Sequence, residues 1–576
     1  MHLPSRQTLP FLRDWGADPV GKGVWRFSIW APQADSVAVT VEGRRTPLRR
    51  YAEGTWRTEA PAEPGETYLF HIDGRTIPDP AARAQSGDVH APSRLVDPTA
   101  HCWTTRWKGR PWPEAVIQEI HIGTFTPEGT FASAARALPR LAELGFTAVE
   151  LMPVAQFAGR HGWGYDGVLP YAVHPAYGTP DDLKRFVEAA QALGLMVILD
   201  VVYNHFGPDG FHLAAVAPVF HPEKATPWGQ VIDYTQPPMR RFAIENALYW
   251  LAEYRLDGLR LDAIDGIDDP SDPDLVTELA LTIRNYGFDR PIHLMTEDNR
   301  NITRYNDPAN GLRIAEWNDD WHHAIHALLT GESHDYYASF ARDPLDDIRL
   351  SLAEGFVEQG QPRPPLTEPR GEPSGHLPPT AFVIFNQNHD QIGNRPLGDR
   401  LVTLTDPAQA RIAHALLLTA PMIPLTFMGE EAGTRTPFRF FSDHKGDLAA
   451  SIREGRAREF PGLHGDDLPD PNDPAVFHAS RPDRAPDAAE WEALTAALLD
   501  LRATRIVPLL KSGKPDATVT AAPPATIDAL WRFPGGTLRM TARFATDPQA
   551  TPPKDPPLFA IGDPATDPAF ALWIED

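Results

Sequence analysis

Four carboxylic acids stand at or just after the ends of short apolar segments that are typical of buried β-strands. They are Asp200, Asp262, Glu297 and Asp390. If the segments form a parallel barrel, these side chains meet at its C-terminal rim, where barrel enzymes place their active sites. One carboxylate at a strand end is usually a loop cap or an ion-pair partner, but several at one rim favour a catalytic site.

The chemistry that fits is glycoside hydrolysis, which needs one ionised and one protonated carboxyl group. Side chains alternate along a strand, so Arg260 and Asp262 share a face and would point into the barrel mouth. A nearby guanidinium favours the ionised carboxylate that a nucleophile needs, although a structural ion pair has the same pattern. Glu297 follows an apolar strand about one βα unit later, where desolvation would raise its pKa and suit it to acid/base catalysis; the adjacent Asp298 is its rival.

A polar run from Asn386 to Asn394 directly follows another apolar strand candidate. Such a run is often a solvated turn, but in a barrel mouth its side chains can bind sugar hydroxyls. We expect Asp390 and His389 to bind the sugar whose ring flattens in the transition state, and His205 to contact a hydroxyl. The histidines come from separate strands without the short spacing of zinc ligands, so we expect no metal and no other cofactor.

Alternating strands and helices must position these residues. Strand candidates recur from residue 116 to residue 427, and helices are predicted over 134–144 and 181–193. Pro139 predicts a kink or break in the first helix, whereas Thr179 and Pro180 suit the N-cap and first position of the second. The repeat predicts an α/β fold, a closed (β/α)8 TIM barrel. A doubly wound open sheet is the alternative, but no Gly-rich phosphate loop favours it.

Segments rich in β structure flank this region. Residues 25–98 alternate apolar and polar side chains between turns, and short β runs return after about residue 495. We therefore predict an N-terminal β-sandwich over 1–105, a catalytic barrel over 106–490 and a small C-terminal β-sandwich over 491–576. The segment 27–34 resembles the N-terminal carbohydrate-associated module of branching and debranching glucosidases, and a simple packing domain is the alternative.

Composition disfavours several partners. The 576 residues carry 53 Lys and Arg against 77 Asp and Glu, a formal charge of −24, which opposes binding to nucleic acid or anionic membranes. No apolar stretch approaches the roughly 18 residues of a transmembrane helix, and the first residues lack a signal-peptide pattern. Because Cys102 is the only cysteine, no intrachain disulfide is possible, and we expect a cytoplasmic protein.

In chain order, the motifs resemble the four motif regions of the α-amylase superfamily of glycoside hydrolases. The quoted residues are Asp200-Val-Val-Tyr-Asn-His, Gly258-Leu-Arg-Leu-Asp-Ala, the strand end at Glu297, and Asn388-His-Asp. The resemblance implies a retaining mechanism in which Asp262 is the nucleophile, Glu297 the acid/base and Asp390 the transition-state stabiliser.

The same resemblance implies supporting residues around the sugar. Tyr165 matches the tyrosine that stacks under the sugar in the −1 subsite. The other matching substrate-binding residues are Asp200, His205, Arg260 and His389. The Asn204 position binds calcium in true α-amylases, but no further ligand set is visible, so no obligatory metal is expected.

Finer features resemble one subfamily, which hydrolyses the α-1,4 bond next to the terminal trehalose of maltooligosyl trehalose. They are the segments 121–131, 316–323, 386–395, 427–431 and 453–456. Within 316–323, Asn318, Asp319 and His322 are the predicted contacts on the trehalose side, although the run could be a polar barrel loop. Gln118 and Trp321 depart from the expected aromatic residues. The implied partners are an α-glucan oligosaccharide substrate and a maltooligosyl trehalose synthase acting in the preceding step.

Two other hypotheses remain open on the sequence alone. A glycogen branching enzyme has the same barrel and an N-terminal sandwich, and the catalytic residues cannot distinguish hydrolysis from transfer. A non-catalytic glucan-binding or transporter-accessory protein belongs to another class. Such proteins generally lack part of the carboxylate trio, which is complete in this chain.

Overall fold

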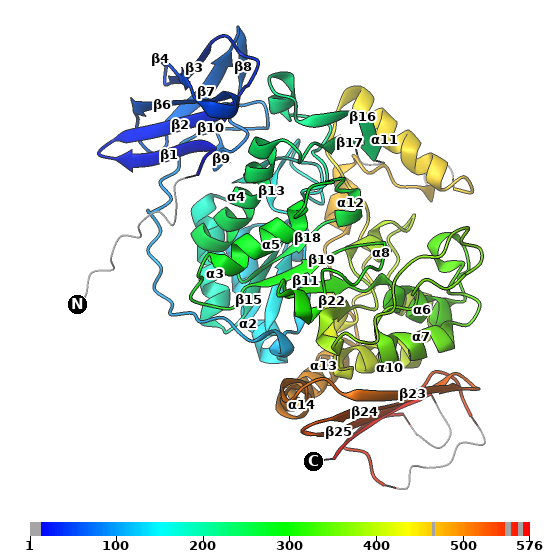
Figure 1. Cartoon of the computed structure of the whole chain (residues 1–576). Helices are drawn as coiled ribbons and strands as arrows, with labels where there is room; N and C mark the ends of the chain where they lie inside the picture. The colour runs from blue at the N-terminus through cyan, green and yellow to red at the C-terminus, as the bar shows by residue number, and fades with distance from the viewer. Residues whose placement is uncertain (1–12, 227–228, 464–466, 548–554, 563–567, 576) are drawn as a thin grey trace.

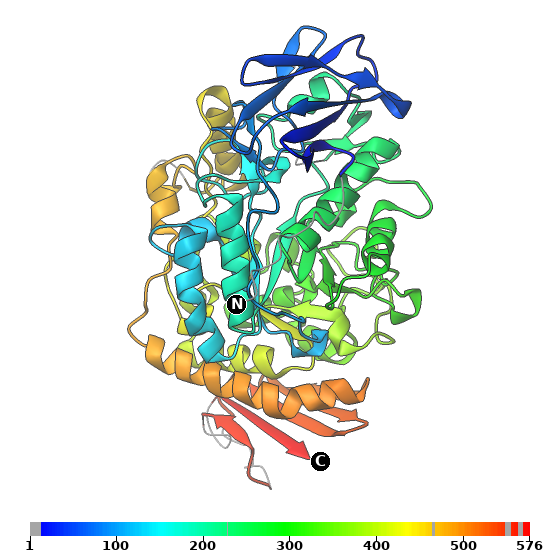
Figure 2. The same ribbon diagram turned by 90° about the vertical axis from the view of Figure 1, so that its left-hand side faces the viewer.

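The computed structural model describes residues 13–226, 229–463, 467–547, 555–562 and 568–575. Two antiparallel sheets from the N-terminal part lie at one end of the molecule, and a sheet from the C-terminal part lies at the other (Figures 1 and 2). A barrel and its helices lie between them. The prediction that the first residues form no signal peptide concerns residues 1–12, which lie outside the described part. Within that part, no helix has the length and apolar character needed to cross a membrane.

Eight parallel strands close into the central barrel, which confirms the predicted (β/α)8 fold and contradicts a doubly wound open sheet. In barrel order they are β11 (Ile117–Ile120), β12 (Ala148–Leu151), β15 (Met196–Val201), β18 (Gly258–Leu261), β19 (His293–Thr296), β20 (Ile314–Trp317), β21 (Phe382–Ile384) and β22 (Ile423–Phe427). Apolar side chains such as Ile198, Met295 and Leu425 fill the interior. Because the strands are buried on both faces, they appear in the sequence as short apolar runs.

Helices cover the outside of the barrel. The main ones are α2 (Phe131–Leu144), α3 (Pro180–Ala192), α4 (Pro237–Glu253), α5 (Leu275–Asn285), α6 (Asp319–Thr330) and α10 (Pro407–Thr419). Thr179 caps α3, accepting a hydrogen bond from Asp182 N, with Pro180 in the first turn as predicted. The predicted break in α2 is wrong, since the helix continues through Pro139. Burial of its apolar face, including Leu138 and Leu141, offsets the cost of the missing hydrogen bond.

The N-terminal strands form two sheets around a separate apolar core that includes Phe27, Val39 and Phe70. The first sheet runs β1 (Gly16–Gly21), β2 (Val24–Trp30), β6 (Thr55–Pro61) and β5 (Arg49–Arg50). The main path of the second runs β4 (Arg44–Pro47), β3 (Val37–Val41), β7 (Thr67–Ile72), β10 (Ser93–Arg94) and β9 (Ala84–Gln85). Burial alternates along β7, and this explains why apolar and polar residues alternate in the sequence that predicts strands here.

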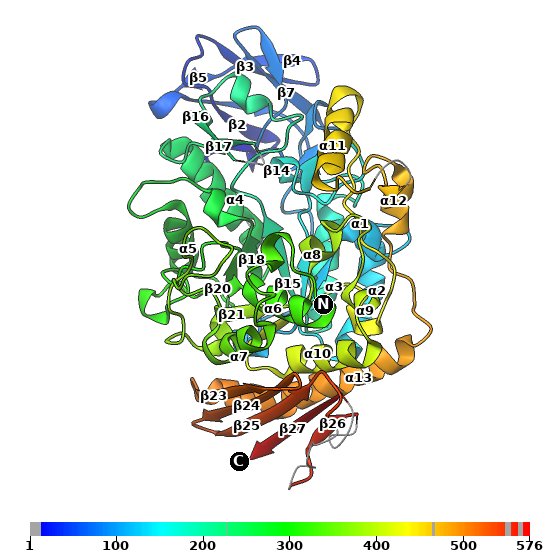
Figure 3. The ribbon, with the colours of Figure 1, turned by 90° about the vertical axis from the view of Figure 1, so that its right-hand side faces the viewer.

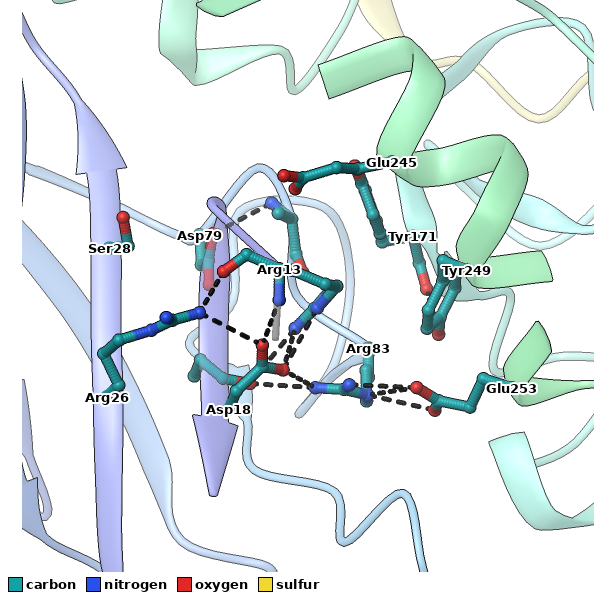
Figure 4. Close-up of polar contacts among 12 residues, drawn as sticks. Arg13, Asp18, Arg26, Ser28, Asp79, Arg83, Tyr171, Glu245, Tyr249 and Glu253 are labelled. Atoms are coloured by element: carbon teal, nitrogen blue, oxygen red, sulfur yellow. Dashed lines mark hydrogen bonds and ion pairs between the residues drawn. The ribbon is translucent and has the colours of Figure 1, made fainter. Parts of the chain in front are cut away.

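A buried ionic network joins these sheets to the barrel helix α4 (Figure 4). The Arg83 guanidinium lies between two carboxylates, donating from Nη1 to Asp18 Oδ1 at 2.8 Å and from Nη2 to Glu253 Oε2 at 2.9 Å. Arg13 Nε donates to Asp18 Oδ1 at 3.1 Å. Burial alone would raise the pKa of Asp18, but the charges of Arg13 and Arg83 outweigh it and lower the pKa to about 2. Asp18 therefore holds both arginines as a carboxylate at neutral pH.

The C-terminal strands form one described sheet, so the second sheet of the predicted sandwich is not found among the described residues. Its order is β23 (Asp516–Ala522), β24 (Thr526–Phe533), β25 (Gly536–Arg543), β27 (Ala569–Glu575) and β26 (Phe559–Ile561). Helices α7 (Pro344–Glu354) and α10 pack on this sheet (Figure 3). Helices therefore bury the apolar side of β24, which carries Ile527 and Trp531. The alternating pattern of β24 indicates that one side is buried, but it does not show whether a second sheet or helices bury it.

Candidate active site

Arg260 is at the centre of the polar cluster at the C-terminal ends of the barrel strands. Its Nη1 donates to Asp200 Oδ2 and to Asp262 Oδ1, both at 2.7 Å, and its Nη2 donates to Glu297 Oε2 at 2.6 Å. The guanidinium is fully buried and lies 4.2 Å from the ring centroid of Trp317. One rigid cation thus fixes three carboxyl groups from neighbouring strands relative to one another.

Asp262 directly follows β18 and is held from two sides. Oδ1 accepts from Arg260, and Oδ2 accepts from Asn204 Nδ2 at 2.7 Å. The next residue, Ala263, has a positive φ of 36°, so the backbone turns sharply as it leaves the strand. Both carboxylate oxygens accept hydrogen bonds, so the group is presented to the barrel mouth in one fixed orientation.

Glu297 directly follows β19, and its side chain is 22% exposed. Oε2 accepts from Ala263 N at 2.9 Å as well as from Arg260. Desolvation raises its pKa well above the usual range; Arg260 opposes this shift, while the negative charges of Asp262 and Asp390 add to it. The raised pKa favours the protonated form of Glu297, which can donate a proton to an atom in the open part of the site.

Asp390 lies in the short helix α8 (His389–Gly393), which Asn388 caps. Its Oδ1 accepts from Asn394 Nδ2 at 3.2 Å, and its Oδ2 lies 3.4 Å from His389 Nε2. Burial would raise the pKa of Asp390, but the charge and hydrogen bond of His389, with help from Arg260, lower it below the usual value. The lowered pKa favours the carboxylate form of Asp390, whose negative charge acts on Glu297.

Tyr165 comes from the connection between β13 (Ala155–Phe157) and β14 (Gly167–Val173). Its hydroxyl donates to Asp200 Oδ2 at 2.6 Å, and its ring stacks on His389 with centroids 5.1 Å apart. Burial raises the pKa of Asp200 to about 7, against the lowering effect of Arg260. His205 is buried beside Asn204, and burial lowers its pKa. The structure thus places all three of Tyr165, Asp200 and His205 around the carboxylates.

Of the three predicted trehalose-side contacts, only Asp319 joins this cluster. Asp319 Oδ1 accepts from Gln391 Nε2 at 3.1 Å, and burial, with the charge of Asp390, raises its pKa to about 7. Asn318 is buried and its amide donates to Gly355 O at 2.8 Å. Its side chain therefore anchors a loop, and this placement does not support a sugar contact.

His322 is also enclosed. Its Nδ1 donates to Asn386 O at 2.6 Å, and its Nε2 accepts from Tyr337 OH at 2.9 Å. Residues Asp335–Tyr337 form a short helical turn that packs on α6, and the Tyr337 ring lies against His322. The predicted substrate contact at His322 is therefore not supported, because both ring nitrogens are used inside the protein.

Three residues in the site were not predicted to act there. Asn204 was noted only as a calcium position, whereas it donates to Asp262. Trp317 lies against Arg260, and Glu119 contacts His389 from β11. A signal for Glu119 exists in the sequence, since it shares the inward face of its strand with Ile117 and is a charge in an apolar run.

Within the described ranges, no three His, Cys, Asp or Glu side chains group in a way that would hold a metal ion. The absence of an obligatory metal stays a prediction. Asn204, at the predicted calcium position, already uses both ends of its amide. Its Nδ2 donates to Asp262 O at 2.8 Å and to Asp262 Oδ2, and its Oδ1 accepts from His205 Nδ1.

Comparison with known proteins points to one family. The alpha amylase catalytic-domain family model matches residues 93–217. A malto-oligosyltrehalose trehalohydrolase from Deinococcus radiodurans is 43% identical over 481 residues, which cover 81% of this chain and 78% of that protein. A crystal structure of a Salmonella typhimurium protein superposes with a TM-score of 0.94 at 46% identity, covering 98% of this chain and 100% of the other.

The match to a rival family is shorter. A 1,4-alpha-glucan branching enzyme from Thiobacillus denitrificans is 36% identical over 276 residues, which cover 41% of this chain and 37% of that enzyme. The likeness to branching enzymes is therefore partial, whereas the likeness to the Deinococcus protein extends over most of both chains.

Proposed function

This chain belongs to the malto-oligosyltrehalose trehalohydrolase family, and from this premise we propose that it hydrolyses the α-1,4 bond next to the terminal trehalose of maltooligosyl trehalose. The products are trehalose and a shortened maltooligosaccharide. The chain is a glycoside hydrolase with an α-amylase catalytic domain. The finer assignment to this bond rests on the family relationship, and the paired carboxyl groups of the site support the retaining mechanism.

The observation that carries the proposal is the pairing of two carboxyl groups on one guanidinium. Arg260 binds Asp262 and Glu297 through adjacent nitrogens, so the two groups face one small space. In retaining glycosidases the two carboxyl groups are about 5–5.5 Å apart, because one of them attacks the sugar directly. The arrangement supports direct attack by Asp262, with the protonated Glu297 as acid.

In the first step Asp262 attacks the anomeric carbon of the sugar on the non-trehalose side. The bond from that carbon to the glycosidic oxygen breaks, and Glu297 gives its proton to this oxygen. Trehalose leaves with the proton, and the remaining glucan stays bound to Asp262 through an ester. Arg260 and Asn204 keep the nucleophile oriented during this step.

In the second step the ionised Glu297 takes a proton from water, and the water oxygen attacks the same carbon. The ester to Asp262 breaks, and the maltooligosaccharide leaves with the original configuration. Positive charge develops on the sugar ring in both transition states. The proposed role of the Asp390 carboxylate, whose pKa is lowered, is to stabilise that charge, and Tyr165, which stacks on His389, would supply an aromatic face.

We assign the remaining parts of the chain by the same argument. Residues 1–105 form the proposed carbohydrate-module-like domain, 106–490 the catalytic domain and 491–576 the C-terminal domain. The proposed reaction requires a substrate that already ends in trehalose. It would therefore follow a maltooligosyl trehalose synthase, and we propose that both act in the cytoplasm.

The experiment that tests the function is product analysis with purified maltooligosyl trehalose beside plain maltooligosaccharides of equal length. Release of free trehalose at a higher kcat/KM than hydrolysis of the plain oligosaccharide supports the proposal. New α-1,6 linkages on amylose would support a branching enzyme instead. Binding of both substrates without turnover would support a non-catalytic glucan-binding protein.

A further inference from the structure

Glu119 is buried in the barrel wall and binds His389 at two points. It lies on β11, on the strand face that also carries Ile117. Its Oε2 accepts from the backbone N–H of His389 at 3.1 Å, and its Oε1 accepts from the ring Nδ1 of the same residue. One side chain thus fixes both the backbone and the ring of His389, which is 270 positions away in sequence.

The other ring nitrogen of His389 faces the catalytic cluster. Nε2 lies 3.4 Å from Asp390 Oδ2. The ring is stacked on Tyr165 and meets Trp163 edge-on at a centroid distance of 5.4 Å. His389 is therefore confined between two carboxylates and two aromatic rings, and it has little freedom to rotate.

We propose that Glu119 is a positioning residue that keeps His389 doubly protonated and directed at Asp390; this inference rests on the proposed role of Asp390 in the reaction. Glu119 does not touch the sugar. It acts through the imidazolium, whose positive charge keeps Asp390 ionised for the transition state. A carboxylate that orients a histidine and stabilises its cation is a recognised catalytic arrangement.

The charges around His389 support this protonation state. Burial disfavours the cation, but Asp390 and Glu119 favour it more strongly and raise the pKa of His389 well above its usual value. Other titratable or charged groups near His389 come from neighbouring elements of the barrel. His121 directly follows β11, Glu150 lies on β12, Asp200 on β15, Arg260 on β18 and Tyr165 in the β13–β14 connection.

Glu150 provides a matched comparison for Glu119. The two residues are register partners on adjacent strands and are equally buried. Neither carboxyl oxygen of Glu150 has a hydrogen-bond partner within the described part of the chain. Burial and the charge of Glu119 raise the pKa of Glu150 well above its usual range, which favours its neutral form. Of this pair, only Glu119 supports the histidine.

The first test compares Glu119→Gln with Glu150→Gln by the rate of trehalose release across pH. We expect Glu119→Gln to lower kcat about 10- to 100-fold, the range for a lost hydrogen bond between charged groups. His389 then loses its proton at lower pH than Glu297 does, so His389 instead of Glu297 sets the alkaline limb of the kcat profile, and the limb shifts to lower pH. Glu150→Gln should keep the wild-type limb. An unshifted limb in Glu119→Gln would overturn the proposal.

The second test does not depend on activity. Protein with 15N-labelled histidine is titrated by NMR, and the His389 signal is identified by its loss in His389→Gln. We expect a cationic ring at pH 8 in the wild type and a neutral ring in Glu119→Gln. A neutral wild-type ring refutes the inference even if Glu119→Gln does not fold. A cationic ring in a protein that releases no trehalose would refute the proposed function and leave the Glu119–His389 relationship standing.

Discussion

The Arg260 guanidinium donates to Asp262 Oδ1 at 2.7 Å although only one residue separates them in the chain. The pair meets because alternate residues of β18 share the inward face, and Asp262 continues this alternation just past the strand. The same guanidinium binds Glu297, the first residue after the next barrel strand. A local strand pattern and a neighbouring strand end thus bring the two carboxyl groups of the proposed retaining mechanism to one guanidinium.

Removal of either proposed catalytic carboxyl group should abolish most turnover without unfolding the protein. Asp262→Ala should lower kcat by several orders of magnitude, since no ester can form. Glu297→Gln should lower it by about 100- to 10,000-fold, the range for a lost general acid. Folding should persist because Arg260 keeps Asp200 and one further partner in each variant. Steady-state kinetics and thermal unfolding of the purified variants check both expectations.

Asp298→Asn is the matched control for Glu297→Gln. Asp298 is the adjacent carboxylate, but it is buried and bonded to Arg300 at 2.7 Å, away from the Arg260 cluster. Its replacement should leave kcat within a few-fold of the wild type. If Asp298→Asn abolishes turnover while Glu297→Gln retains it, the acid/base assignment belongs to Asp298.

Activity should fall at both ends of the pH range. The pKa of Glu297 is raised, so the acid form persists through neutral pH, and kcat should fall as pH rises through that pKa. The pKa of Asp390 is lowered, so its carboxylate should be lost only in strongly acidic solution. A kcat profile measured with saturating substrate checks this. A rate that keeps rising beyond about pH 9 would contradict a protonated Glu297.

A metal chelator should not change the rate of trehalose release. The expectation follows from Asn204, whose amide oxygen would be the calcium ligand but already accepts from the ring Nδ1 of His205. The assay compares enzyme treated with EDTA and then freed of it by gel filtration with untreated enzyme. A loss of activity that added calcium or zinc restores would show that the enzyme needs a metal.

The ionic network in Figure 4 should stabilise the attachment of the N-terminal sheets. Asp18→Asn leaves Arg13 and Arg83 buried without their shared carboxylate and should lower the free energy of unfolding by about 3–5 kcal/mol. The folded pKa of Asp18, about 2, is below its usual value. Its contribution is therefore present above that usual value and is lost as pH falls towards 2. Denaturant unfolding at several pH values measures both effects.

Glu66→Gln is the control for the network variant. Glu66 pairs with Arg44 at 2.8 Å in the same N-terminal region, but the Arg44 side chain is 56% exposed. Solvent screens such a pair, so its removal should change the free energy of unfolding by less than about 1 kcal/mol. Equal effects of the two substitutions would show that burial does not strengthen the Asp18 network.

Much of the fold was predictable because its signals are local. The apolar runs at 148–152, 196–202 and 314–317 correspond to strands β12, β15 and β20. Side-chain alternation placed Arg260 beside Asp262, and the order of strand ends placed the acidic residues at one rim. The C-terminal sheet was harder, since the alternation in β24 shows that one face is buried but not that helices bury it.

The sequence by itself determined the barrel, the four acidic residues at its rim and the central Arg260, because strand periodicity and the order of strand ends depend only on neighbouring residues. The tertiary structure decided which polar residues reach the open site. It turned Asn318 and His322 inward, and it brought Glu119 to His389. These outcomes depend on contacts between distant segments and on burial. Burial raises the pKa of Glu297, whereas the charge and hydrogen bond of His389 outweigh burial at Asp390 and lower its pKa.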